Sequence, residues 1–189
     1  PAKAKEGRLS EIRPCLGCCL GCIHAVLVNK EPGSCVVNPE VGREHKLQNE
    51  TKTADPLTIL IAGAGPAGMA AARQSACQGH KTVLCEKTDQ AGGLLSLASK
   101  APGRGELDDI LSFLKTEIGR LQVDVRYNTP LSSQLIHEIN PDKVILATGS
   151  MPDMPMIKGL FQSQMDVATN VDVISGKETI GEKVIVLGG

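Results

Sequence analysis

Residues 57–72 read LTILIAGAGPAGMAAA, and the predicted fold follows from this stretch. The apolar run before the glycines predicts a strand buried on both faces, and the small residues after them predict a helix packed closely against it. Between the two, Gly63, Gly65 and Gly68 have the spacing G-x-G-x-x-G. In such a turn Gly63 allows the tight bend, Gly65 lets a pyrophosphate approach the main chain, and the helix beginning near Pro66 directs free N–H groups at that phosphate. The stretch therefore predicts a dinucleotide-binding site.

An acidic residue ends the next predicted strand. Glu86 closes the run KTVLCE, eighteen residues after Gly68, and Lys87 follows it. A carboxylate at this place hydrogen-bonds a ribose hydroxyl of a bound dinucleotide. Three glycines alone would also suit a strand-to-helix turn without a ligand, so Glu86 is the residue that favours nucleotide binding.

The remainder of the chain alternates between strand-like and helix-like patterns. Apolar residues recur at helical spacing over 107–121, after a loop over 88–106 that is rich in glycine and proline. A strand, a short helix and another strand are expected over 123–128, 132–139 and 143–150. This order predicts an α/β fold, a Rossmann-like parallel sheet with flanking helices, preceded by a small cysteine-rich segment.

Five of the seven cysteines fall between positions 15 and 35. A dense group in a chain that otherwise looks cytosolic argues for a metal site rather than a disulfide framework. The spacing of Cys15, Cys18, Cys22 and the distant Cys35 favours a 4Fe-4S cluster. Structural zinc stays the alternative, although it usually takes two paired C-x2-C units.

Either Cys18 or its neighbour Cys19 could be the second ligand of the cluster. A loop cannot readily direct both Cys18 and Cys19 at one cluster, and we expect Cys18 to bind and Cys19 to be a free thiol. His24 is expected to be an ordinary surface or packing histidine. Cys77 and Cys85, on the predicted first helix and second strand, are expected to be small buried hydrophobic residues.

Composition excludes several classes of partner. The net charge of -1 gives no electrostatic basis for binding nucleic acid or an anionic membrane. Aromatic residues make up 2% of the chain, too few for a single-strand binder. The longest apolar stretch is interrupted by three glycines and a proline, so neither a membrane span nor a signal sequence is expected. These features predict a cytoplasmic protein.

The ordered motifs RPCLGCCLGC, GAGPAGMAAA, EKTDQAGGL and ILATGS together resemble the NADH:flavin oxidoreductases typified by bacterial dienoyl-CoA reductase and trimethylamine dehydrogenase. The resemblance implies a cluster segment over 1–55, an FAD-binding domain over 56–183, and the first strand of an NAD(P)-binding domain over 184–189. It also implies a longer polypeptide, of which this sequence is the middle part, with a barrel domain that carries FMN and the substrate site. The resemblance also allows the complete polypeptide to form an oligomer.

The same resemblance assigns roles to individual positions. The 4Fe-4S ligands would be the four cysteines named above, and FAD, or ADP in some members, would lie at the glycine turn. No catalytic residue is expected in this chain, because the family's acid and base belong to the barrel. The cofactor-binding positions implied are Gly63, Ala64, Gly65, Pro66, Ala67, Gly68, Glu86, Lys87, Gly93, Leu94, Arg104, Val125, Thr148 and Gly149.

The implied activity is electron transfer from NAD(P)H through FAD and the cluster to FMN, where an activated C=C bond of an enoate or enoyl-CoA type is reduced. NADH and NADPH are not distinguished. One alternative is a flavin and iron–sulfur protein like the small subunit of glutamate synthase, which generally has two sets of four cysteines. Another is a module without redox function, in which zinc and ADP are structural.

Overall fold

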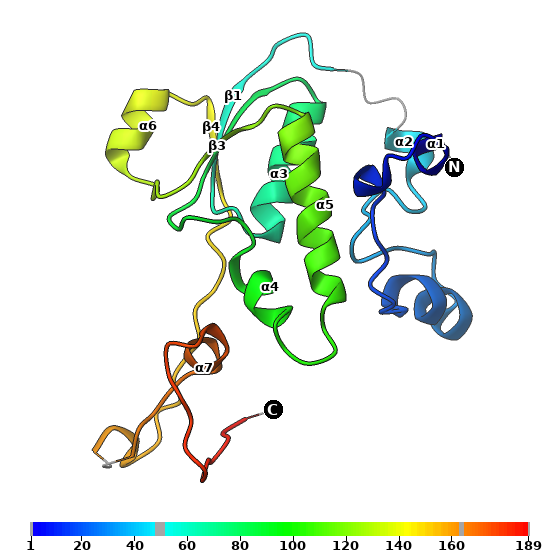
Figure 1. Ribbon diagram of the computed structural model, residues 1–189. Coiled ribbons are helices and arrows are strands. Elements are labelled where there is room, and N and C mark those ends of the chain that lie inside the picture. The colour runs from blue at the N-terminus through cyan, green and yellow to red at the C-terminus, as the bar shows by residue number, and fades with distance from the viewer. Residues whose placement is uncertain (1, 48–51, 163–164, 189) are drawn as a thin grey trace.

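A parallel four-stranded sheet forms the centre of the protein in a computed structural model, which describes residues 2–47, 52–162 and 165–188. The strand order is β3-β2-β1-β4, so the chain runs outward from β1 through β2 to β3 and then returns to place β4 on the other side of β1. Figure 1 shows helices on both faces of the sheet. The strands are β1 (Thr58–Ala62), β2 (Lys81–Cys85), β3 (Asp124–Arg126) and β4 (Lys143–Leu146).

The first strand is central because its residues are apolar on both faces. Leu60 and Ile61 are fully buried, and Leu60 is paired with Val83 of β2 and Val144 of β4. The helix α3 (Pro66–Cys77) begins with Pro66 at its first position, where a missing N–H breaks no helical hydrogen bond. The predicted strand–glycine–helix unit is confirmed.

Two clusters of buried side chains cover the two faces of the sheet. On one face α3 and α5 (Glu106–Arg120) pack against odd-numbered residues of β1, including Ile59 and Ile61. On the other face, Leu135 of α6 (Ser133–Ile139) packs against Leu60 and Ala62. The helical stripe predicted over 107–121 is therefore core, as expected.

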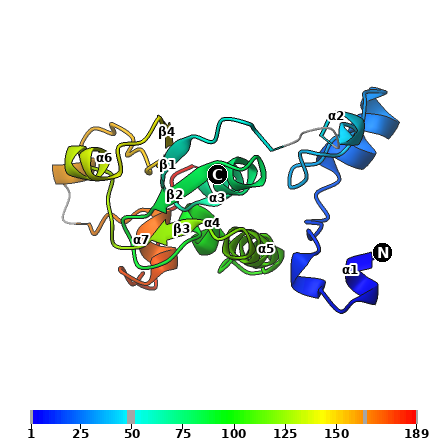
Figure 2. The same cartoon turned by 90° about the horizontal axis from the view of Figure 1, so that it is seen from above.

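The N-terminal segment lies beside α5, as Figure 2 shows from above. It contains α1 (Ala2–Lys5), the short helix η1 (Leu9–Glu11), a π-helix η2 (Leu20–Asn29) and α2 (Glu44–Leu47). Among the described side chains of residues 2–45, Ala25 is the one that is buried. This segment has almost no core of its own.

Two expectations about secondary structure are wrong. The loop predicted over 88–106 contains a helix, α4 (Gly93–Ala98), whose start is marked by two glycines with positive φ angles. The strand predicted near the C-terminus does not form over the described residues 182–188, where the side chains of 184–187 are 51–81% exposed. A strand needs a neighbour for its backbone groups, and no described strand pairs with this apolar run.

The remaining elements follow β4. They are η3 (Leu160–Gln162) and α7 (Asn170–Ser175), and Thr169 caps α7 in a reciprocal pair with Asp172. Residues 48–51, near the boundary implied between the cysteine-rich segment and the nucleotide-binding domain, lie outside the described residues. No described helix combines the length and the apolar character that crossing a membrane requires.

Candidate functional site

The glycine turn lies where β1 meets α3, at the carboxyl ends of the strands. Gly63 has a φ of 101°, and a Cβ there would run into the backbone carbonyl of Ala147, which follows β4. A Cβ on Gly68 would overlap the carbonyl oxygen of Gly63. Both positions therefore need glycine for the strand, the turn and the helix to pack this closely.

Gly65 differs from these two glycines because nothing lies within 4 Å of the place where its Cβ would be. Its φ of -72° is ordinary for any residue, so backbone strain does not require glycine here. The open space lies at the N-terminus of α3, between β1 and β4, where the strand order reverses direction. In open parallel sheets this is the place where dinucleotides bind.

The loop after β2 completes the wall of this space. The Gly92 N–H donates to the carbonyl of Ala64 at 2.9 Å. Next to it, a Cβ on Gly93 would come within 3.3 Å of the Gly65 Cα, so the two backbones are adjacent. Leu94 follows with a side chain that is 43% exposed. The predicted residues at 63–68 and 93–94 are thus brought together.

Glu86 ends β2 with a carboxylate that is already held by the protein. One oxygen accepts from the Ala64 N–H at 2.8 Å, and the other accepts from the N–H and the hydroxyl of Thr88, both at 2.9 Å. Burial raises the pKa of Glu86, but these hydrogen bonds outweigh burial and the net pKa lies below the ordinary value. Glu86 is therefore ionised near neutral pH and is fixed against the glycine turn. Its predicted contact with a ribose stays a prediction.

The other predicted cofactor-binding residues differ in how close they lie to the carboxyl ends of the strands, where the glycine turn is. Thr148 and Gly149 are exposed just beyond β4, directly after Ala147, which lies against Gly63. Lys87 is exposed beside Glu86. Farther along, Val125 is half-buried in β3, and Arg104 is exposed in the loop between α4 and α5.

The cysteine segment brings its two ligand-bearing stretches together through the backbone. The Ser34 N–H donates to the Gly21 carbonyl at 2.7 Å, which places Cys22 and Cys35 on neighbouring stretches. A Cβ on Gly21 would lie 2.6 Å from the Ser34 hydroxyl, so only glycine allows this approach.

The four proposed ligand cysteines form no disulfide bonds, and three of them are exposed. Cys15, Cys18 and Cys22 are exposed and Cys35 is half-buried. The Gly17 N–H donates to the Cys15 sulfur at 3.3 Å, a type of bond that iron–sulfur ligands commonly accept. Four thiols on two adjoining stretches fit the donor set of a cubane cluster. Within the described ranges, however, no three Cys, His, Asp or Glu side chains converge as a metal site.

Cys19 differs from its neighbour in backbone conformation. Its φ is 55°, and its thiol donates to the Gly17 carbonyl at 3.5 Å. His24 is exposed. Of the two cysteines expected to be buried, Cys85 is 1% exposed, and burial raises the pKa of its thiol. Cys77 is only half-buried, because it lies at the end of α3.

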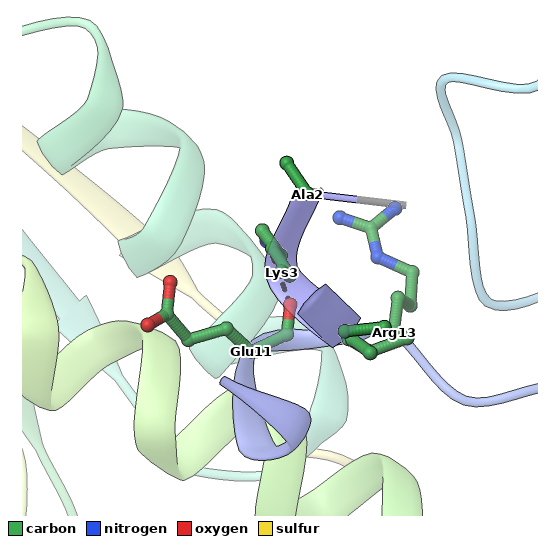
Figure 3. A pocket seen from close by; sticks show the side chains of 6 residues that line it. Ala2, Lys3, Glu11 and Arg13 are labelled. Carbon is green, nitrogen blue, oxygen red and sulfur yellow. Dashed lines mark hydrogen bonds between the residues drawn. The ribbon is translucent and has the colours of Figure 1, made fainter. Parts of the chain in front are cut away.

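A pocket near the N-terminus lies away from the proposed nucleotide site. This pocket of about 370 Å³ is lined by Ala2, Lys3, Ala4, Glu11, Ile12 and Arg13, and in Figure 3 the Lys3 ammonium donates to the carbonyl of Glu11 at 2.7 Å. None of its lining residues belongs to the edge of the sheet where the glycine turn lies.

The comparisons with known proteins agree with this geometry. The family model described as pyridine nucleotide-disulphide oxidoreductase matches residues 57–189. The chain belongs to this family. Its sheet, glycine turn and flanking helices are the family's Rossmann-like FAD-binding domain, and the cysteine segment precedes that domain.

Individual relatives extend the likeness to the cysteine segment. NADH oxidase of Thermoanaerobacter brockii is 39% identical over all of this chain and 29% of its own length. Cinnamate reductase of Clostridium sporogenes is 35% identical over all of this chain and 28% of its own length. The structure of a 2-naphthoyl-CoA reductase complex superposes with a TM-score of 0.88 at 33% identity, covering 96% of this chain and 27% of that one. The resemblance to NADH:flavin oxidoreductases is thus confirmed, and the chain spans less than a third of the length of these relatives.

Sequence patterns did not identify every residue that shapes the site. Thr88 and Ala147, which contact Glu86 and Gly63, lie within the motifs EKTDQAGGL and ILATGS, but the motifs assigned neither residue a role. Arg13 and Glu117 contribute to the contact between the cysteine segment and the flavin domain, and they lie 104 positions apart in the sequence. Arg13 is the first residue of the motif RPCLGCCLGC, and this position was the one signal that the sequence offered for it.

Proposed function

We propose that this chain is the electron-transfer part of an NAD(P)H-dependent flavin and iron–sulfur oxidoreductase. It would bind FAD and a 4Fe-4S cluster and deliver electrons to FMN in a barrel domain elsewhere in the polypeptide, where an activated C=C bond is reduced. Two relatives, cinnamate reductase and 2-naphthoyl-CoA reductase, support this class of substrate. The relative called NADH oxidase is the one whose name supports NADH rather than NADPH.

The observation that carries the proposal is the open backbone at Gly65, bordered by Gly93 and by the carboxylate of Glu86. The α3 N-terminus would bind the pyrophosphate, since its first N–H groups have no partner within the helix. Glu86 would accept a hydrogen bond from the adenosine ribose through the acceptor capacity that Ala64 and Thr88 leave free. Leu94 would face the flavin side of the cofactor, while the backbone near Val125 would face the adenine.

The cysteine segment would hold the cluster with Cys15, Cys18, Cys22 and Cys35. When bound, FAD accepts two electrons together and releases them singly, and a 4Fe-4S cluster carries one at a time. The exposure of the cysteines leaves them accessible to a cluster, and the Gly21–Ser34 contact keeps the two stretches in register.

Elemental analysis and colour test this proposal directly. The complete polypeptide, purified without oxygen, is expected to contain iron, acid-labile sulfide and FAD, and to lose its brown-yellow absorbance when dithionite is added. A colourless protein that contains zinc and ADP would instead support the module without redox function. Two sets of four iron atoms per chain would favour the arrangement of the glutamate synthase small subunit.

A pair of neighbouring substitutions tests the ligand assignment. Cys22→Ser should abolish cluster assembly, whereas Cys19→Ser, one of the adjacent thiols, should leave iron and sulfide near the wild-type content. FAD content serves as the control, because neither residue lies in the glycine turn. The assignment is wrong if the Cys19 variant loses the cluster while a Cys18→Ser variant keeps it.

A further inference from the structure

Charged side chains form a continuous series of contacts between the cysteine segment and the flavin domain. From the segment come Glu11, Arg13 and Glu40, and from helices α3 and α5 come Arg73, Glu117 and Arg120. Glu40 contacts both Arg13 and Arg73 at 3.5 Å. At the other end, Arg120 lies 3.9 Å from Glu11. The segment, which has little core, is therefore attached largely through these groups.

The centre of the series is buried in the flavin domain. Glu117 is 1% exposed, and its carboxylate accepts from Arg73 at 2.9 Å and from Arg120 at 3.0 Å. A buried carboxylate is tolerated only while its cationic partners stay in place. Arg73 is in turn shared with Glu40 of the cysteine segment. This arrangement favours one position of the segment over neighbouring ones.

Arg13 connects this series with both stretches that carry the proposed ligands. It lies two residues before Cys15, and its guanidinium donates to the side-chain oxygen of Asn38, three residues after Cys35. The same group lies 5.2 Å from the centre of the Phe113 ring in α5. Its side chain is 15% exposed, and in Figure 3 it projects from the chain just after Glu11.

Apolar contacts support the same attachment. Leu16 and Val37 pack against the buried cluster that contains Phe113. Leu16 directly follows the proposed ligand Cys15. Val37 directly precedes Asn38, which accepts the hydrogen bond from Arg13. Arg13 thus lies at the junction of two cysteine-bearing stretches and one helix of the flavin domain.

We propose that Arg13 is a positioning residue, which fixes the cluster at a set place relative to the flavin by joining the Cys15 and Cys35 stretches to α5. The inference rests on the proposed function for its cluster and flavin. A planar guanidinium performs the two tasks together, because its edge donates hydrogen bonds to Asn38 and Glu40 while its face lies against an aromatic ring.

Two substitutions in the complete polypeptide separate the contacts of the Arg13 guanidinium from its positive charge. Arg13→Gln removes the contacts and the charge, whereas Arg13→Lys keeps the charge but loses the planar guanidinium. We expect amide hydrogen exchange over residues 13–22 and 35–40 to become roughly tenfold faster in Arg13→Gln and less so in Arg13→Lys. FAD content should be unchanged in both.

Electron transfer supplies the readout that a purely structural role would not produce. Transfer of one electron from reduced flavin to oxidised cluster should slow in both variants, by roughly tenfold in Arg13→Gln. The reduction potential of the cluster should fall in Arg13→Gln and stay near wild type in Arg13→Lys, since a nearby positive charge favours the reduced form. Arg126→Gln is the matched control, because it breaks an exposed ion pair with Glu138 away from this interface.

The outcomes distinguish this inference from the proposed function. Wild-type exchange in Arg13→Gln, or a wild-type transfer rate despite faster exchange, overturns the role of Arg13. Loss of iron from Arg13→Gln supports it only if exchange also accelerates, and overturns it otherwise. If Arg13→Gln does not accumulate, Arg13→Lys carries the same test. A wild-type protein without iron or sulfide refutes the proposed function, whereas the exchange measurement still decides whether Arg13 attaches the segment.

Discussion

The glycine turn and the cysteine segment are held in place by different forces. The turn is part of the core: Gly63 and Gly68 allow contacts that a single methyl group would prevent, and its neighbours Ala62 and Ala64 are buried. The cysteine segment is mostly exposed and is attached to α3 and α5 through ion pairs and a few half-buried side chains. One site is therefore formed by packing, and the other depends on its neighbour and on the ligand it is proposed to bind.

Gly68→Ala should have the largest effect, because it disturbs packing where the turn has no space. The added methyl group would overlap the Gly63 carbonyl oxygen, so the strand and the helix must move apart. We expect a loss of about 3 kcal/mol in the free energy of unfolding, together with loss of bound FAD. Urea denaturation and flavin absorbance measure the two effects. A stable variant that keeps FAD would show that the turn is less tightly packed than the structure indicates.

Glu117→Gln tests the ionic attachment, where a smaller effect is expected. The substitution leaves Arg73 without its buried carboxylate, and we expect a loss of about 2 kcal/mol at neutral pH. Burial raises the pKa of Glu117, but its hydrogen bonds with Arg120 and Arg73 outweigh burial and hold the pKa below the ordinary value.

The difference in the free energy of unfolding between wild type and Glu117→Gln should depend on pH in a defined direction. A carboxyl whose pKa is lowered by folding stabilises the protein above its unfolded pKa of about 4.3 and loses that contribution as the pH falls through the folded value. The gap between wild type and Glu117→Gln should therefore be full at pH 7 and should shrink below about pH 4. Asp124→Asn, in an exposed ion pair with Arg126, is the control and should change stability little at any pH.

Gly65→Ala should separate ligand binding from packing. The methyl group would enter open space, and the backbone conformation suits alanine, so the protein without ligand should lose less than about 1 kcal/mol as its helix N-cap becomes poorer. FAD affinity should fall roughly tenfold, equal to about 1.4 kcal/mol, because the space would be taken by carbon. Titration of the flavin-free protein measures this affinity. Equal losses of stability in Gly65→Ala and Gly68→Ala would remove the distinction between the two glycines.

The sequence was most informative where structure depends on neighbours in the chain. Glycine spacing, the apolar run at 57–62 and the helical stripe at 107–121 predicted β1, α3 and α5, because each pattern reports local geometry. The helix α4 was missed, since Gly92 and Gly93 signal a loop and also mark the residues at its start. The run at 182–188 has the pattern of a strand, but a pattern cannot supply the partner that a strand requires.

Long-range contacts explain what remained hidden at the two sites. The hydrogen bond between Glu86 and Ala64 joins residues 22 positions apart, and that between Arg73 and Glu117 joins residues 44 positions apart. No sequence pattern predicts either hydrogen bond, because the fold rather than the local chain brings the partners together. The spacing of the cysteines identified a candidate donor set, but it did not reveal that the segment depends on an interface with α5.

Leu16→Ala should have the smallest effect, and it addresses the apolar part of that interface. Leu16 is half-buried against the core cluster of the flavin domain, so its truncation should lower the free energy of unfolding by about 1 kcal/mol. Leu27→Ala is the matched control, because Leu27 lies on η2 with 64% of its surface exposed and should be within about 0.5 kcal/mol of wild type. Urea denaturation of both variants measures the two changes in the free energy of unfolding. A larger loss in Leu27→Ala would mean that η2 packs against another part of the polypeptide, and the cysteine segment would then be held from two sides instead of by α3 and α5 alone.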